Sequence, residues 1–276
     1  MSPRVTVPSL AAMKTAGAKI TAMVVWDYQM ARIVDRADVD MLVVGDSVGV
    51  NLWGHANPFE VTLEQMLVVA QAVRRGTARA LVCCDVPFGP VQEGNAVPAA
   101  VRLVKEAGVD LVKLDGASDY PDAVRDVDRA GIPVFAQFGI TPQRALRYGL
   151  DYAAMAGPDA QVPEQMTDEL VREAKTLEQA GAAMLDFTNS GPVAGAEVAR
   201  AVTIPVLGGF GGGPWLDGRV RMVNAAIGYA ASNVDDPADT YANVARTAFE
   251  AITAFAADVR SARQIRGGVP VPRTQD

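Results

Sequence analysis

MLVVGDS (residues 41–47) is the first of four segments in which a short apolar run ends with an aspartate. The others are ALVCCDVPFG (80–89), LVKLDG (111–116) and AAMLDFTNSG (182–191), and the four acids are Asp46, Asp85, Asp115 and Asp186. Such runs are typical of strands buried in a parallel sheet. An acid at the end of a buried strand is costly unless it is paired or holds a cation. Four acids in equivalent places therefore predict one shared site.

Strand and helix patterns alternate around these segments. Strands are expected at residues 20–25, 41–46, 80–87, 109–116, 132–139, 182–188 and 204–212, with a weaker eighth at 223–230. Helices are expected at 9–17, where Ser9 would be the cap, and at 27–37, 61–76, 96–108, 120–131, 166–181 and 193–202, while 47–60 is expected to be a loop. This alternation predicts a parallel sheet with crossover helices.

The length favours closure of that sheet. The chain has 276 residues, close to the ~250 of a typical (β/α)8 TIM barrel. The composition does not change along the chain, so we expect a single domain spanning residues 1–276, with a helical tail from about residue 236. In such a barrel, chemistry is found at the carboxyl ends of the strands, where the four aspartates fall.

Composition and motifs exclude several classes of function. The net charge is −7 and no basic stripe is present, which argues against nucleic-acid binding. The N-terminal segment reads as neither a signal peptide nor a membrane anchor, and no uninterrupted apolar stretch reaches the ~20 residues of a spanning helix. The adjacent Cys83 and Cys84 would point to opposite faces of a strand and not pair, so a reduced, cytoplasmic location is expected. Neither common nucleotide-binding glycine motif is present.

The residue types favour a hard metal ion. Only one histidine, His55, is present, which argues against a zinc site built on imidazoles. Carboxylates and hydroxyls suit Mg²⁺, which keeps several waters and binds a substrate oxygen as well. Asp46 and Asp85 are the predicted direct ligands, with Asp115 reached directly or through water. For any one aspartate, a helix cap or a turn is the alternative.

Three further residues suggest chemistry on a 2-oxo acid. Ser47 is beside Asp46 and could bind a carboxylate or keto oxygen. Lys113 is two residues before Asp115 and faces the same side of its strand; it could neutralise a substrate carboxylate, form a Schiff base or make a buried ion pair. A metal would polarise the keto oxygen and stabilise an enolate, and Asp186 is the candidate base. The glycine-rich run at 208–214 could offer backbone N–H groups to an anion or be a flexible turn.

Six stretches together resemble the ketopantoate hydroxymethyltransferase family. They are VVGDSVG (43–49), WGHANPFEVTLEQM (53–66), VRRG (73–76), DVPFG (85–89), VKLDG (112–116) and FGITPQ (138–143). Their order and spacing also match, and the likeness runs from about Lys19 to about Gly218. The resemblance implies a (β/α)8 barrel of the phosphoenolpyruvate/pyruvate type in a large homo-oligomer, possibly a decamer. It also implies Mg²⁺-dependent transfer of a hydroxymethyl group from 5,10-methylenetetrahydrofolate to 2-oxoisovalerate, the first committed step toward pantothenate.

The resemblance also implies roles for individual positions. Asp46 and Asp85 match the family's metal ligands. Ser47 and Lys113 match residues that hold the keto acid, so the predicted substrate-binding residues are Ser47, Asp85, Lys113 and Gln137. The predicted catalytic residues are Asp186 and Lys113.

The chain is a divergent member at three positions. Asp115 and Asp186 stand where the family has glutamates, and Gln137 where it has a histidine. Each shorter acid withdraws its carboxylate by roughly 1.5 Å, which matters because a misplacement of ~1 Å can cost a hundredfold in rate. The chain could be a ketopantoate-forming enzyme with altered details, or a paralogue acting on another 2-oxo acid. A folate-independent aldolase or C–C lyase of the same superfamily and a non-catalytic keto-acid-binding protein are the remaining alternatives.

Overall fold

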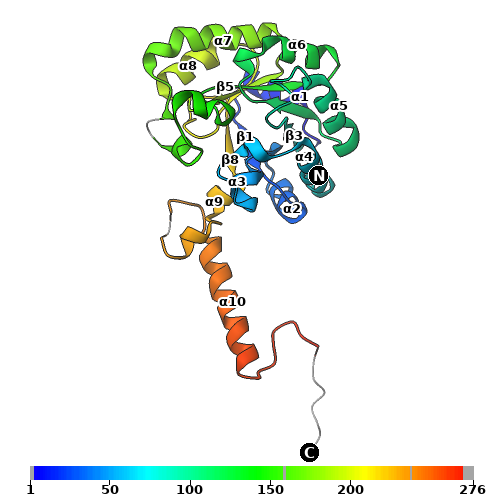
Figure 1. Ribbon diagram of the computed structural model, residues 1–276, viewed down its shortest axis with the longest axis vertical. Coiled ribbons are helices and arrows are strands. Elements are labelled where there is room, and N and C mark those ends of the chain that lie inside the picture. Colours follow the sequence, from blue (N-terminus) through cyan, green and yellow to red (C-terminus); the bar gives the residue numbers. More distant parts are fainter. Residues whose placement is uncertain (1–2, 158–159, 237, 270–276) are drawn as a thin grey trace, which may run out of the picture. The chain divides into compact units, whose positions relative to one another are not determined.

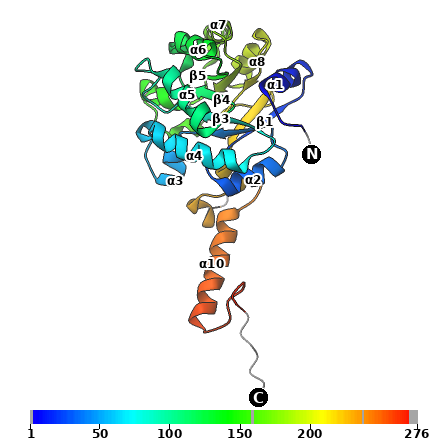
Figure 2. The ribbon, with the colours of Figure 1, turned by 90° about the vertical axis from the view of Figure 1, so that its right-hand side faces the viewer.

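The computed structural model describes residues 3–157, 160–236 and 238–269 (Figures 1 and 2). The chain divides into two compact units, residues 1–221 and 222–276. The first unit contains the strands and the predicted site residues. The second contains the helical segment expected in the tail.

Eight parallel strands form the centre of the described structure, with helices around them (Figure 1). They are β1 (Ile20–Val24), β2 (Met41–Val44), β3 (Leu81–Asp85), β4 (Leu111–Leu114), β5 (Val134–Gly139), β6 (Met184–Thr188), β7 (Val206–Leu207) and β8 (Gly218–Met222). Their order is β7-β6-β5-β4-β3-β2-β1-β8. The prediction of a (β/α)8 barrel is confirmed.

The barrel is nearly closed between its first and last strands in this order. The backbone N–H of Asp217 donates to the Val206 carbonyl at 2.9 Å, and that of Val220 donates to Gly208 at 3.1 Å. Because these bonds join the β7 and β8 regions, every strand has a neighbour on both sides. The strand ends are thereby brought around a common mouth.

Helices connect the strands. In the first unit the α-helices placed by the structure are α1 (Val7–Thr15), α2 (Tyr28–Arg36), α3 (Val48–Trp53), α4 (Leu63–Gly76), α5 (Ala96–Ala107), α6 (Pro121–Arg129), α7 (Thr167–Gln179) and α8 (Pro192–Ala201). Short 3₁₀ segments are η1 (Pro58–Glu60), η2 (Ala117–Asp119), η3 (Pro142–Tyr148), η4 (Ala153–Ala156) and η6 (Glu164–Met166). The crossover from β5 to α7 is thus a run of 3₁₀ turns.

The core explains why the strands are apolar throughout. Every residue of β2, β3, β4, β5 and β6 is buried, because one face of each strand meets the lumen and the other meets the helices. Phe138 and Phe187 stack with ring centroids 4.6 Å apart and join β5 to β6. Cys83 and Cys84 are buried free thiols, as predicted.

The prediction for the eighth strand is wrong. Residues 223–230 do not form a strand, and Val223–Ile227 is instead the helix α9. The strand is β8, whose sequence GRVRM carries two arginines and lacks the continuous apolar run used to find the other strands. Its first residue must be small, since a Cβ on Gly218 would lie 2.3 Å from the Ile20 carbonyl oxygen.

Local boundaries also differ from the prediction. The first helix is capped by Thr6, and Ser9 at its third position completes a capping box. Residues 47–60 are not wholly a loop, because they contain α3 and η1. Asp27 caps α2 by accepting from the Met30 backbone, as expected.

The second unit is helical. It contains α9, η7 (Ala231–Val234) and α10 (Val244–Arg260). Among the residues of α10, only Ala245 is buried, and the side chains of Phe249, Ile252, Phe255 and Val259 are half or more exposed. Among the residues that the structure describes, no helix has both the length and the apolar composition needed to cross a bilayer.

Candidate active site

The four predicted acids meet at the carboxyl ends of their strands. Asp85 is the last residue of β3, Asp186 lies within β6, and Asp46 and Asp115 follow β2 and β4. None of the four is more than 5% exposed. The parallel register brings them to one level of the barrel, because each strand presents the same end to the mouth.

Asp46 and Asp85 are direct neighbours. Val44 at the end of β2 pairs with Cys84 on β3. This register brings Asp46, two residues after Val44, close to Asp85, which follows Cys84. The backbone N–H of Asp46 donates to Asp85 Oδ2 at 3.2 Å. The charge of Asp46 also raises the pKa of Asp85, although burial raises it more. Asp46 and Asp85 are therefore buried neighbours at the mouth of the barrel.

Lys113 links this pair to the proposed base. Its Nζ lies 3.3 Å from Asp85 Oδ1 and 3.5 Å from Asp186 Oδ2. Burial lowers the pKa of Lys113, but the carboxylates of Asp85 and Asp186 outweigh burial and raise it well above the usual range. A lysine held in its charged form is a poor nucleophile. The geometry therefore favours the ion pair or the binding of a substrate carboxylate over a Schiff base.

The acids outnumber the cations around them. Burial raises the pKa of Asp46 to about 6, of Asp85 to about 7 and of Asp115 to about 6. Burial also raises the pKa of Asp186, against the opposing effect of Lys113. Raised pKa values mean that the folded chain does not fully compensate four buried negative charges. Further positive charge at the mouth would stabilise their ionised forms.

The donor set fits a hard divalent cation. Around the acids, four buried oxygens have no well-formed hydrogen bond; they are Asp115 Oδ1, Thr141 Oγ1, Gln143 Oε1 and Asp85 Oδ1, the last of which faces the Lys113 ammonium at 3.3 Å. The described residues contain no preformed cage of three or more Asp, Glu, His or Cys side chains. Mg²⁺ does not require one, because it usually binds one or two carboxylates and completes its shell with water and substrate oxygens.

Gln143 is a site residue that the sequence analysis did not single out. Its Nε2 donates to Asp46 Oδ2 at 2.9 Å, and its backbone N–H donates to Asp115 Oδ2 at 3.1 Å. It is the last residue of the FGITPQ stretch, and its position in that motif is the only signal the sequence offers. It lies in a 3₁₀ turn with no strand or helix periodicity, so no pattern predicts its partners.

Ser47 and Gln137 also lie at the mouth. Ser47 is half-buried directly after Asp46, and its hydroxyl and that of Tyr152 interact. Burial raises the pKa of Tyr152 to about 12. Gln137 pairs in register with Asp186, but its amide donates to Thr188 Oγ1 at 2.7 Å. Tyr152, which lies in the β5–α7 crossover, is a second residue that sequence reasoning missed.

The glycine-rich loop after β7 also reaches the site. The backbone N–H of Gly209 donates to Asp186 Oδ1 at 3.2 Å, so a backbone donor meets an anion belonging to the protein itself. The next residue, Phe210, has a φ of 44° and packs edge-on against Tyr152, with centroids 6.0 Å apart. Its carbonyl accepts from Arg219 Nη2 at 2.8 Å. The loops after β5 and β7 thus meet over the acids.

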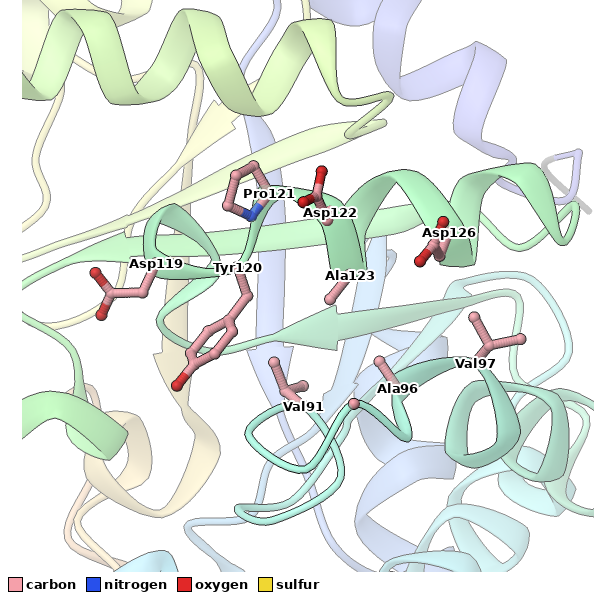
Figure 3. A pocket seen from close by; sticks show the side chains of 10 residues that line it. Val91, Ala96, Val97, Asp119, Tyr120, Pro121, Asp122, Ala123 and Asp126 are labelled. Atoms are coloured by element: carbon pink, nitrogen blue, oxygen red, sulfur yellow. The ribbon is translucent and has the colours of Figure 1, made fainter.

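The structure also contains a pocket lined by other residues. It has a volume of about 290 Å³ and is formed by the segments that follow β3 and β4 (Figure 3). Its lining residues are Val91, Gly94, Ala96, Val97, Asp119, Tyr120, Pro121, Asp122, Ala123 and Asp126. None of the predicted site residues lines it.

Fold and site together define the class of protein. A (β/α)8 barrel with acids and a lysine converging at the carboxyl ends of its strands is an enzyme of the TIM-barrel class. Residues 4–264 match the family described as ketopantoate hydroxymethyltransferase. The chain belongs to this family of transferases.

Curated relatives cover almost the whole chain. A 3-methyl-2-oxobutanoate hydroxymethyltransferase from Salinibacter ruber is 38% identical over 260 residues, which are 94% of this chain and 96% of the relative. One from Cyanothece sp. is 36% identical over 263 residues, which are 93% and 97%. These relatives confirm the resemblance found in the sequence motifs.

Solved structures of low identity share the fold. A putative phosphonomutase from Burkholderia cenocepacia J2315 has a TM-score of 0.61 at 16% identity and covers 93% of this chain and 98% of its own. A 2,3-dimethylmalate lyase of the PEP mutase/isocitrate lyase superfamily has a TM-score of 0.56 at 16% identity, with 97% and 90% covered. A phosphonopyruvate hydrolase in complex with oxalate and Mg²⁺ has a TM-score of 0.56 at 16% identity, with 98% and 93% covered.

Proposed function

We propose that this enzyme transfers a hydroxymethyl group from 5,10-methylenetetrahydrofolate to a 2-oxo acid, 2-oxoisovalerate or an analogue, with Mg²⁺ as cofactor. The family and the names of the relatives support the reaction class. The observation that carries the proposal is the convergence of Asp46 and Asp85 with Lys113, which reaches from Asp85 to Asp186. This arrangement would bring a cation site and a base together within one buried cluster.

Asp46 and Asp85 would hold Mg²⁺, with Asp115 contributing directly or through water. The site oxygens without a well-formed hydrogen bond and the raised pKa values of these acids support this assignment. When bound, Mg²⁺ would polarise the keto oxygen and stabilise the negative charge that develops there. A protein of the same fold has been crystallised with oxalate and Mg²⁺, which shows that this barrel type can accommodate both.

Side chains of the protein itself would carry out the remaining steps. Ser47 and the Lys113 ammonium would bind the substrate carboxylate and orient C3 toward Asp186. Asp186 would take the C3 proton, and the electron pair of that bond would attack the methylene carbon of the folate donor. Both carbon–nitrogen bonds of the donor methylene would break in turn with their electrons going to the two nitrogens, one as the carbon–carbon bond forms and one as water supplies the hydroxyl oxygen. The two nitrogens would take up the C3 proton held by Asp186 and one proton of that water. Burial of Asp186 at 2% exposure favours a base stronger than an ordinary carboxylate.

Proton exchange at C3 tests the proposal without requiring the donor. Wild-type protein with Mg²⁺ should exchange the C3 deuterium of labelled 2-oxoisovalerate or a related 2-oxo acid, as followed by NMR. Adding 5,10-methylenetetrahydrofolate should then yield the hydroxymethyl product. Absence of both across a panel of 2-oxo acids would overturn the proposal.

The same experiment separates the alternatives. Exchange without any response to the folate donor, combined with condensation or cleavage in the presence of a free aldehyde, would identify an aldolase or lyase. Binding of the keto acid without exchange would identify a non-catalytic protein. The shortened acids at 115 and 186 are the observation that keeps these alternatives worth testing.

A further inference from the structure

Gln143 contacts the ends of three strands. Its side-chain Nε2 donates to Asp46 Oδ2 at 2.9 Å, after β2, and approaches the Val86 carbonyl at 3.4 Å, after β3. Its backbone N–H donates to Asp115 Oδ2 at 3.1 Å, after β4. The residue itself follows β5 and is 8% exposed. Gln143 therefore contacts two of the three predicted metal ligands, Asp46 and Asp115. It also contacts Val86, the residue that follows the third predicted ligand.

The surroundings determine the orientation of the amide. Both contacts of Nε2 are to oxygen acceptors, a carboxylate and a carbonyl. Turning the amide over would place Oε1 against these two acceptors and leave no donor for them, so the network assigns a single orientation. The Asp46 carboxylate is consequently held by a donor that cannot rotate away without loss.

A neutral donor suits this position. A lysine or arginine would orient Asp46 equally well but would cancel the negative charge that a cation needs. The amide orients the carboxylate and leaves its charge in place. It also leaves its own Oε1 buried without a hydrogen-bond partner.

We propose that Gln143 is a positioning residue that holds the Asp46 carboxylate in the orientation required for binding a divalent cation. The proposal rests on the proposed function, in which Asp46 is a metal ligand. Outer contacts of this kind typically contribute about 10- to 100-fold to metal affinity. Because the backbone bond to Asp115 does not involve the side chain, substitution at position 143 removes the Asp46 contact and the longer contact to the Val86 carbonyl, and leaves the Asp115 contact in place.

The test compares Gln143→Met with Gln71→Met by titration calorimetry of metal-free full-length protein with Mg²⁺. Met matches the length of Gln but cannot donate. Gln71 lies on α4 and donates one comparable bond from Nε2, to the Glu106 carbonyl at 3.1 Å, away from the site. We expect Mg²⁺ affinity to fall about tenfold or more in Gln143→Met and to stay at the wild-type value in Gln71→Met, with metal-free melting temperatures recorded for both.

The outcomes are distinct. If wild type binds Mg²⁺ and Gln143→Met binds it equally well, the positioning role is refuted while the proposed function stands. If wild type itself binds no Mg²⁺, the metal assignment of the proposed function fails first. Gln143→Asn serves if the methionine variant does not fold; it keeps a polar amide but withdraws the donor by one methylene, so the same loss of affinity is expected. Wild-type affinity in a folded Gln143→Asn would also overturn the inference.

Discussion

Lys113 lies between two acids for which we propose different roles. Asp85 lies beside Asp46, where a cation would bind, whereas Asp186 lies across the mouth and receives a backbone N–H from Gly209. The lysine is within 3.5 Å of both. Metal binding and proton abstraction are therefore expected to separate when the two acids are changed one at a time.

Asparagine substitutions test this separation. Asp186→Asn should retain Mg²⁺ affinity and lose C3 exchange by about a hundredfold or more, because the general base is gone. Asp85→Asn should lose both, because a metal ligand is replaced by a neutral amide. Calorimetry with Mg²⁺ and NMR exchange on the same preparations measure the two effects. Full exchange by Asp186→Asn would show that the base is another residue.

The buried acids also predict how stability depends on pH. Asp46, Asp85 and Asp115 have pKa values of about 6, 7 and 6 in the folded metal-free chain, above the ordinary value of 3.8. Between about pH 4 and pH 7 the folded chain therefore binds more protons than the unfolded chain. The contribution of these groups to the free energy of unfolding must fall as pH rises through that window.

Metal-free protein should accordingly melt at a higher temperature near pH 5 than near pH 8. Mg²⁺ should reduce or reverse this difference, because it binds the deprotonated carboxylates. Differential scanning calorimetry with a chelator and with Mg²⁺ provides the comparison. A melting temperature of the metal-free protein that rises steadily from pH 5 to pH 8 would contradict the prediction.

At the scale of elements, β8 closes the barrel where the pattern of the sequence is weakest. The apolar segment at 223–230 looks more like the other strands than GRVRM does, yet it forms α9. What selects β8 is space, since the strand starts at a glycine packed against the β1 backbone. The position of a segment in the closed sheet is not a local property of the sequence. Here that position, and not the hydrophobicity of the segment, determined which residues form the eighth strand.

Gly218→Ala tests this packing. The added Cβ would meet the Ile20 backbone oxygen at 2.3 Å, so one strand must shift. We expect a loss of unfolding free energy on the order of 3 kcal/mol, the upper part of the usual range for overpacking. Chemical denaturation measures it. Gly17→Ala is the control, because its Cβ meets nothing within 4 Å and only the left-handed backbone at φ 70° opposes it, for about 1 kcal/mol; an equal loss in both variants would refute the steric account.

At the scale of the whole molecule, α10 carries an exposed apolar stripe. A stripe of Phe249, Ile252, Phe255 and Val259 follows one face of the helix at helical spacing, and all four side chains are largely exposed. Exposed apolar surface of this extent is typical of interaction sites. We propose that it is covered in the homo-oligomer that the family resemblance implies.

Light scattering after gel filtration tests this assembly. The wild-type chain should be larger than a monomer, and Ile252→Glu with Phe255→Glu should shift it toward smaller species, because charge is costly in an apolar interface. Ala254→Glu places the same charge on the opposite face of the helix and should leave the size unchanged. A monomeric wild type, or an unchanged size in the double variant, would contradict the prediction.

The sequence by itself determined the barrel and most of its site. Buried parallel strands need apolar residues on both faces, so their apolar runs can be recognised in the sequence without knowledge of the neighbouring strands. An acid that ends such a run can be recognised together with it. Asp46, Asp85, Asp115 and Asp186 were predicted in this way, and Lys113 from its position two residues before Asp115. The family followed from motifs of fixed order and spacing.

Only the tertiary structure decided which groups touch. Gln143 lies in the 3₁₀ segment η3 and Tyr152 in the turn before η4. These segments carry no periodic signal, and the partners of both residues come from other parts of the chain. The eighth strand was set by closure of the sheet. Local sequence patterns predict whether a residue is buried, because burial depends on its own side chain. A contact depends on two segments of the chain, and only the folded structure defines how far apart they lie.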